Sequence, residues 1–79
     1  MQIQILYFGL LADRVGLSAE TFDVASGINV ADLRRLLLEK YPYLASEKFK
    51  IAVNQQLASE EMDIPFQAEI ACLPPFAGG

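Results

Sequence analysis

The chain has 79 residues and a net charge of −4, from six basic and ten acidic side chains, with one cysteine and no histidine. That length allows one small domain, and the composition excludes an internal disulfide, histidine-based metal sites and histidine bases. The acidic balance argues against nucleic acid, and the longest early apolar run, residues 5–12, is too short to cross a membrane, so we expect a cytoplasmic domain that binds neither.

The first third of the chain predicts two strands that pair as a hairpin. Residues 2–8 begin with alternating polar and apolar side chains, and Gly9 ends or bulges this strand. A loop is expected around residues 13–16. Residues 20–24 alternate again and stop at Ser26-Gly27, which favours a turn.

One helix and two further strands are predicted in the remainder of the chain. Asn29 is a typical N-terminal cap, and apolar side chains recur at helical spacing from residue 30 to residue 41, before Pro42. Strands follow at residues 49–53 and 69–73. The segment between them is predicted to contain a turn at Asn54-Gln55, a return arm at 56–58 and a solvated acidic connection at 59–63.

This order of elements predicts an α+β fold with one main helix packed on one face of a mixed sheet of four to five strands. The arrangement is the β-grasp, or ubiquitin-like, fold if the first and last strands lie parallel at the centre of the sheet. We expect residues 1–73 to form this domain. Pro74-Pro75 ends the hydrogen bonding of the last strand, so residues 74–79 should form a projecting tail.

The strands carry apolar side chains on both faces. Residues predicted to face the helix are Ile3, Ile5, Tyr7, Phe49, Ile51, Val53, Ile70 and Cys72, and those predicted to face away are Leu6, Phe8, Ala52, Ala71 and Leu73. Isolated apolar side chains are common on protein surfaces. A sheet face left to solvent is normally polar, however, so Phe8, Leu73 and Leu57 beyond the turn predict a partner-binding surface next to the tail.

The terminal Gly78-Gly79 carries the most plausible reactive group. A catalytic triad, a phosphate-binding loop and a metal-ligand cluster are all missing from the sequence, and the acidic residues Glu60, Glu61 and Asp63 are explained by solvation. Cys72 is expected to lie in the core. Two glycines form a thin thread that can enter a narrow cleft and present the Gly79 carboxylate. A carboxylate reacts only after activation, for example by adenylation with ATP.

The ending Pro74-Pro75-Phe76-Ala77-Gly78-Gly79 resembles the PPxxGG ending of the small subunit of molybdopterin synthase, within the ubiquitin-like sulfur-carrier family. The resemblance extends to Glu69-Ile70-Ala71, Ala52-Val53-Asn54-Gln55, Leu6-Tyr7-Phe8 with Gly16, and the helix up to Pro42. It covers most of the chain in the same order. The proline pair with Gly-Gly is its specific element.

This resemblance implies that an enzyme related to ubiquitin-activating enzymes uses ATP to adenylate Gly79, which then becomes a thiocarboxylate. It implies that the sulfur passes to cyclic pyranopterin monophosphate to form the molybdopterin dithiolene. Pro74, Pro75, Phe76, Ala77 and Gly78 would insert into a large catalytic subunit within a heterotetramer. Hydrophobic contacts would come from Phe8, Leu57 and Leu73. The chain would be the sulfur-donating, non-catalytic subunit of this sulfurtransferase and would bind no cofactor itself.

Two segments depart from the family pattern. Ala12-Asp13 stands where many members have Arg-Glu, and Phe66-Gln67-Ala68-Glu69 replaces an Asp-Gly-Asp-Glu turn. Three alternatives stay open: the sulfur carrier of thiamine synthesis, a ubiquitin-like protein modifier, and a noncovalent binding module. The length and Pro74-Pro75 argue against the thiamine carrier.

Overall fold

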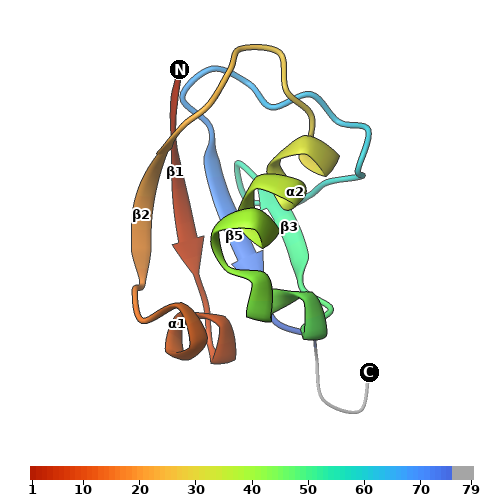
Figure 1. Cartoon of the computed structure of the whole chain (residues 1–79). Helices are drawn as coiled ribbons and strands as arrows, with labels where there is room; N and C mark the ends of the chain where they lie inside the picture. Colours follow the sequence, from red (N-terminus) through yellow and green to blue (C-terminus); the bar gives the residue numbers. More distant parts are fainter. Residues whose placement is uncertain (76–79) are drawn as a thin grey trace.

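A sheet with one long helix across it forms the framework of the computed structural model, which describes residues 1–75 (Figure 1). The elements are β1 (Gln2–Tyr7), α1 (Leu10–Val15), β2 (Ala19–Asp23), α2 (Val30–Lys40), the 3₁₀ helix η1 (Pro42–Ser46), β3 (Lys50–Val53), β4 (Gln56–Leu57) and β5 (Glu69–Leu73).

The five strands lie in the order β2-β1-β5-β3-β4. Antiparallel pairing joins β1 to β2, β5 to β3 and β3 to β4, whereas β1 and β5 are parallel at the centre. The last strand of the chain therefore lies beside the first, as predicted. The mixed sheet with one main helix on one face confirms the β-grasp fold.

Helix α2 begins with a reciprocal cap. The Asn29 side chain accepts a 2.8 Å hydrogen bond from the Asp32 backbone N–H, and the Asp32 carboxylate accepts one of 3.2 Å from the Asn29 N–H. The carboxylate also lies favourably at the positive end of the helix dipole. The helix ends at Lys40, one residue earlier than predicted, before Pro42, whose ring cannot continue a helix.

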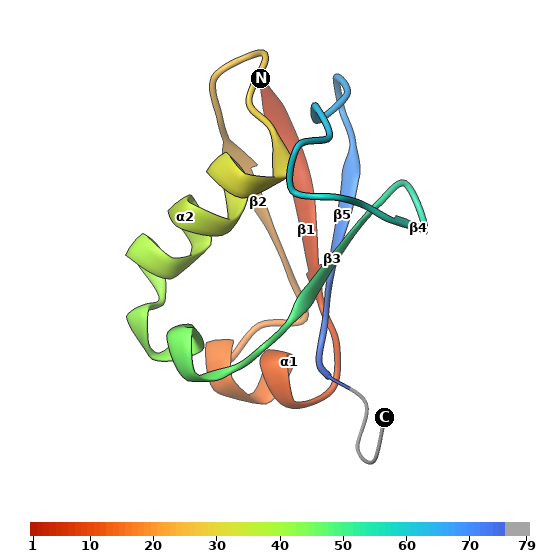
Figure 2. The ribbon, with the colours of Figure 1, turned by 90° about the vertical axis from the view of Figure 1, so that its right-hand side faces the viewer.

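The core fills the space between α2 and one face of the sheet (Figure 2). All the strand residues predicted to face the helix are buried, and Val30, Leu33 and Leu37 meet them from α2 with no exposed surface. These three positions follow the spacing that places side chains on one face of a helix. Within residues 1–75, no helix covers the other face of the sheet.

The prediction of a loop at residues 13–16 was wrong, because residues 10–15 form helix α1. Gly9 precedes it, and Gly16 ends it in the left-handed conformation, with φ of 83° and its N–H bonded to the Ala12 carbonyl. Leu11 anchors the helix in the core. Six residues are too few to show a helical period, and η1 escaped prediction for the same reason.

The segment between β3 and β5 has the predicted turn. Asn54 and Gln55 have φ angles of 48° and 71°, which suit the tight hairpin turn joining β3 to β4. Residues 59–63 are exposed, as predicted for a solvated connection. Their backbone carbonyls also accept hydrogen bonds from the first turn of α2, from Ala31 to Glu60 and from Val30 to Met62, each 2.9 Å long.

Candidate functional site

Strand β5 carries the chain out of the sheet at the end where α1 lies (Figure 1). A 3.2 Å hydrogen bond from the Phe8 N–H to the Cys72 carbonyl extends the parallel pairing beyond β1. Pro74 and Pro75 follow Leu73 and lie outside the sheet, in keeping with their lack of an N–H donor. The predicted site residues Phe76, Ala77, Gly78 and Gly79 lie outside the described residues.

The start of α1 lies against the root of the tail. A Cβ atom placed on Gly9 would lie 3.2 Å from Cγ of Pro74, closer than most side-chain contacts. Gly9 also has φ of 54° and ψ of −131°, a combination that residues with a Cβ rarely adopt. Pro74 is half-buried and Pro75 is exposed. The chain therefore leaves the sheet beside the corner that joins β1 to α1.

The strand register places the outward apolar side chains in two rows. In one row Leu6 lies beside Ala71, Ala71 beside Ala52, and Ala52 beside Leu57. In the next row, nearer the tail, Phe8 follows the Tyr7–Cys72 pair and so adjoins Leu73. We call these six residues the outer patch: Leu6, Phe8, Ala52, Leu57, Ala71 and Leu73.

The outer patch contains all three side chains predicted to bind a partner. Phe8 is 44% exposed and Leu57 is 64% exposed, while Leu73 is half-buried. Ala52 belongs to this face but is buried, because it is small and lies between Leu57 and Ala71. An apolar group of this kind on an open sheet face is typical of an interface.

The half of this sheet face farther from the tail is polar. The residues there are Gln2, Gln4, Thr21, Asp23 and Glu69, paired across β1, β2 and β5. These residues lie toward the ends of the three strands that are farther from the tail. The apolar character of the face is thus confined to the half from which the tail departs.

A cluster that the sequence interpretation missed joins β1 and β2 to the end of α2. Glu20 accepts 2.6 Å hydrogen bonds from the Tyr7 and Tyr41 hydroxyls at one carboxylate oxygen and a 2.7 Å bond from the Lys40 ammonium at the other. The Tyr7 and Tyr41 rings meet edge to face, with centroids 6.2 Å apart. The sequence contained one signal for this cluster: Glu20 is an acidic residue on the face of β2 that is directed toward the core, where it pairs with Ile5.

These contacts shift the protonation of the cluster. Burial alone would raise the pKa of the Glu20 carboxyl, but hydrogen bonds from Lys40, Tyr41 and Tyr7 outweigh it and hold the pKa below the ordinary value. Burial, followed by the hydrogen bond to Glu20, raises the pKa of Tyr7. Because all these groups are satisfied by one another, the cluster supports the fold and offers no free acid or base.

Cys72 is buried in the core, as predicted, with 1% of its surface exposed. Burial raises the pKa of its thiol to about 12. At neutral pH the thiol is therefore protonated, and a protonated, buried thiol is a poor nucleophile. This argues against Cys72 as a carrier of sulfur.

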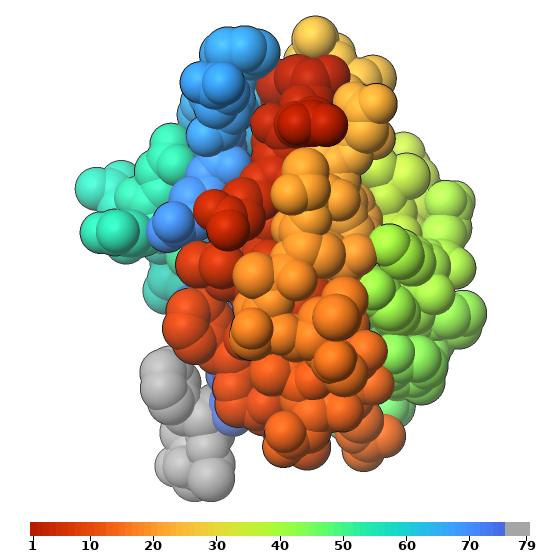
Figure 3. Space-filling model, turned by 90° about the vertical axis from the view of Figure 1, so that its left-hand side faces the viewer, coloured from red at the N-terminus to blue at the C-terminus, as the bar shows by residue number. Residues whose placement is uncertain are grey.

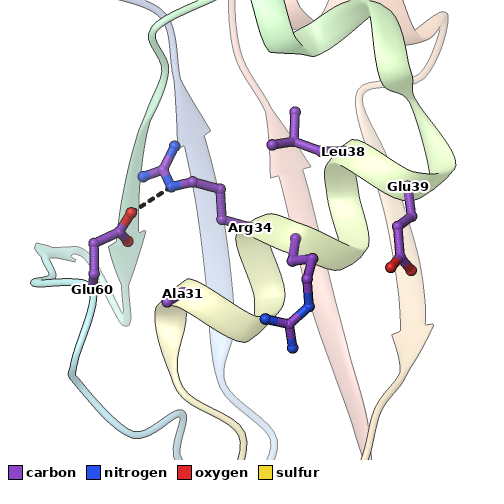
Figure 4. Close-up of a pocket in the computed structure, with 6 residues that line it drawn as sticks. Ala31, Arg34, Leu38, Glu39 and Glu60 are labelled. Atoms are coloured by element: carbon purple, nitrogen blue, oxygen red, sulfur yellow. Dashed lines mark hydrogen bonds and ion pairs between the residues drawn. The ribbon is translucent and has the colours of Figure 1, made fainter.

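The surface of α2 away from the sheet bears a shallow hollow of about 400 Å³. Figure 4 shows Arg34 pointing toward Glu60, whose carboxylate accepts a 2.7 Å hydrogen bond from it, with Leu38 and Glu39 farther along the helix. The Arg34 guanidinium also donates to the Phe49 carbonyl and lies 4.7 Å from the centre of the Phe49 ring. Arg34 therefore braces α2 against β3.

Contacts to other elements are made in or beside both segments that depart from the family pattern. Near Ala12-Asp13, helix α1 makes its ion pair through Arg14, 3.2 Å from Glu47. In the turn before β5, Gln67 has φ of 55°, and the N–H of the buried Ala68 reaches the Pro65 carbonyl. The Glu69 N–H then bonds to the Asn54 side chain.

Two further findings concern residues 1–75. Nowhere in this range do three or more acidic or cysteine side chains gather in an arrangement suited to a metal ion. Neither described α-helix has the length and hydrophobicity needed to cross a membrane.

The sequence model of the ThiS family matches residues 5–79 of this chain. The chain belongs to this family. Relatives named molybdopterin synthase sulfur carrier subunit match its whole length: one from Caenorhabditis briggsae is 35% identical and one from Caenorhabditis elegans 32% identical, with 99% of each relative covered. These matches confirm the family identified from the sequence.

Solved structures agree with the fold. A small protein from Pyrococcus furiosus superposes with a TM-score of 0.88 at 19% identity, covering 96% of this chain and 99% of that one. Small archaeal modifier protein 1 of Haloferax volcanii gives 0.83 at 21% identity, covering 95% and 98%. A chain in the complex of subunits 1 and 2 of the molybdopterin-converting factor from Helicobacter pylori gives 0.71 at 22% identity, with both chains fully covered.

Proposed function

We propose that this protein is the sulfur carrier subunit of a molybdopterin synthase, and that Gly79 carries the sulfur as a thiocarboxylate. The observation that carries the proposal is the full-length similarity, at up to 35% identity, to relatives with that name. The outer patch supports it, because it offers a partner an apolar surface immediately beside the root of the tail.

The proposed chemistry begins with activation of the terminal carboxylate. An adenylating enzyme joins a Gly79 carboxylate oxygen to the α-phosphorus of ATP and releases pyrophosphate. A sulfide-level nucleophile then attacks the acyl carbon, and AMP leaves as a carbon–sulfur bond replaces the carbon–oxygen bond. The thiocarboxylate sulfur then bonds to a carbon of cyclic pyranopterin monophosphate in place of an oxygen substituent, and water cleaves the acyl carbon–sulfur bond to restore the carboxylate; two carriers supply the two sulfurs of the dithiolene. This chain contributes the carrier group and no cofactor.

A large catalytic subunit is the proposed partner for the transfer step. The Helicobacter pylori complex contains subunits 1 and 2 of the molybdopterin-converting factor, and its matching chain has this fold. We expect the tail, including Pro74 and Pro75, to enter the large subunit while the outer patch binds beside the entrance. The expected assembly is a cytoplasmic heterotetramer with two copies of each subunit.

The protein modifier is the second candidate. Small archaeal modifier protein 1 has the same fold, at 21% identity. Fold alone does not separate a modifier from a carrier. The relatives above 30% identity favour the carrier, because they are named as sulfur carrier subunits.

Intact mass spectrometry tests the proposal directly. The purified chain is incubated with ATP, the adenylating enzyme of the same organism and a sulfur donor. We expect a mass gain equal to the exchange of one oxygen for sulfur, located at Gly79 by fragmentation. A matched chain lacking Gly78 and Gly79 should stay unchanged. No gain with an active enzyme would refute the carrier, whereas conjugates with other proteins would favour the modifier.

A further inference from the structure

Lys50 lies among the predicted partner-binding leucines on the outer face of the sheet. It is the first residue of β3 and pairs in register with Leu73 of β5. Phe49 and Ile51 on either side of it are buried, so alternation along the strand directs Lys50 outward, where it is exposed. Ala52, the next residue on the same face, pairs with Leu57. Lys50 is therefore flanked by Leu73 across the sheet and by Leu57 diagonally.

The charge of Lys50 has no counter-ion within residues 1–75. Four other basic side chains form ion pairs there: Arg14 with Glu47, Arg34 with Glu60, Arg35 with Asp32 and Lys40 with Glu20. Lys50 forms none with the described acidic groups. It is thus a cation without an internal partner, set in the half of the sheet face that is otherwise apolar.

We propose that Lys50 is a specificity-determining residue that pairs with a carboxylate on the large subunit when that subunit covers the outer patch. The inference rests on the function proposed above. Covering Leu57 and Leu73 removes water from the side chain between them, and a desolvated ammonium is costly unless an opposite charge meets it. A partner lacking an acidic group at this point is disfavoured even if its surface is apolar.

A specific ion pair of Lys50 can be distinguished from a general effect of net charge, because a basic residue on another surface is available for comparison. The hairpin of β3 and β4 protrudes on the side of the molecule away from α2 (Figure 3). Arg34 of α2 lines a hollow together with Lys50, whereas Arg35 lines a different hollow on α2. Arg35 is a suitable contrast, because it lies on α2 with a 66% exposed side chain. Removing either charge changes the net charge by the same amount.

Isothermal titration calorimetry with the large subunit from the same organism provides the test, comparing Lys50→Met, Lys50→Gln and the control Arg35→Met. Methionine keeps an unbranched apolar stem and removes the ammonium group. We expect both Lys50 variants to bind about tenfold more weakly or worse, since the partner's carboxylate then loses its counter-ion, and Arg35→Met to bind within about twofold of the wild type. Binding of the Lys50 variants should also depend less on salt.

Unchanged or tighter binding of Lys50→Met would overturn the inference, because it would mean that the ammonium reaches solvent beside the interface and meets no carboxylate. Equal losses in Lys50→Met and Arg35→Met would overturn it as well, by showing that only net charge matters. Absence of binding by the wild-type chain is a different result. It would refute the proposed function and its large-subunit partner together.

Discussion

Tyr7 and Glu20 are joined by a 2.6 Å hydrogen bond that links the central strand β1 to the edge strand β2 from within the core side of the sheet. The same carboxylate accepts hydrogen bonds from the Tyr41 hydroxyl and the Lys40 ammonium at the end of α2. One glutamate therefore holds together two strands and the helix at the end of the sheet near the tail. Tyr7 directly precedes Phe8 of the outer patch, so this cluster also fixes the base of the proposed partner surface.

We expect Glu20→Gln to lower the free energy of unfolding by about 2 kcal/mol, the range for hydrogen bonds to a charged group. Three donors converge on the carboxylate, and an amide presents its own N–H donors to some of them. Urea unfolding followed by circular dichroism measures the change. Glu39→Gln, on the exposed side of α2, is the matched control and should have little effect. Equal stability of the Glu20→Gln variant and the wild type would show that the negative charge of Glu20 contributes nothing to stability.

The same cluster predicts loss of stability in acid. The pKa of Glu20 lies below its ordinary value of 4.5 in the folded state. A depressed pKa means that the stabilisation is complete above the ordinary value and is lost as the pH falls through the folded pKa. Urea midpoints measured from neutral pH downward should therefore converge for the wild type and Glu20→Gln. A difference that stays constant across this range would contradict the assignment.

Charge introduced into the outer patch should weaken binding of the large subunit without unfolding the chain. We expect Leu57→Asp, Phe8→Asp and Leu73→Asp each to reduce affinity about tenfold or more, because covering an added carboxylate removes its water. At Leu57 and Leu73 the new carboxylate would also compete with the large subunit for Lys50. Leu57→Asp is the cleanest variant, since Leu57 is 64% exposed. Calorimetry measures the affinity, and a thermal melt of each free variant checks the fold.

Phe66→Asp is the control for this set. Phe66 is 74% exposed in the turn before β5, outside the outer patch and at the opposite end of β5 from the tail. The Phe66→Asp variant should bind the large subunit with the affinity of the wild type. Normal binding of the three patch variants would place the interface on another face of the molecule.

Regular patterns made most of the fold predictable. The helical period of apolar residues identifies α2. The alternation of polar and apolar residues identifies the strands and the two faces of the sheet. The Asn54-Gln55 turn follows from residues that tolerate positive φ. Local patterns fail for α1, which is held by Leu11 and its flanking glycines and is too short to show a period.

The candidate site was predictable where the position of each residue follows from the pattern of its own strand or segment, as for Phe8, Leu57 and Leu73. Pro74-Pro75 and the parity of β5 identify the root of the tail and the outward direction of Leu73. The Glu20 cluster brings together residues from three separate segments, so no spacing in the sequence reveals it. The proposed role of Lys50 likewise depends on the strand register that places it beside Leu73, which the sequence alone does not reveal.

The central position of β5 makes the completion of folding depend on the strand that leads into the tail. β5 lies between β1 and β3, so a growing chain on the ribosome cannot close its sheet until residues 69–73 have emerged. The long sequence separation of β1 and β5 raises the entropy cost of this pairing, which slows folding. A chain truncated before β5 would expose the core edges of both neighbouring strands and be subject to removal. Cells would thus accumulate only those copies in which the strand leading to the terminal glycines is already in place.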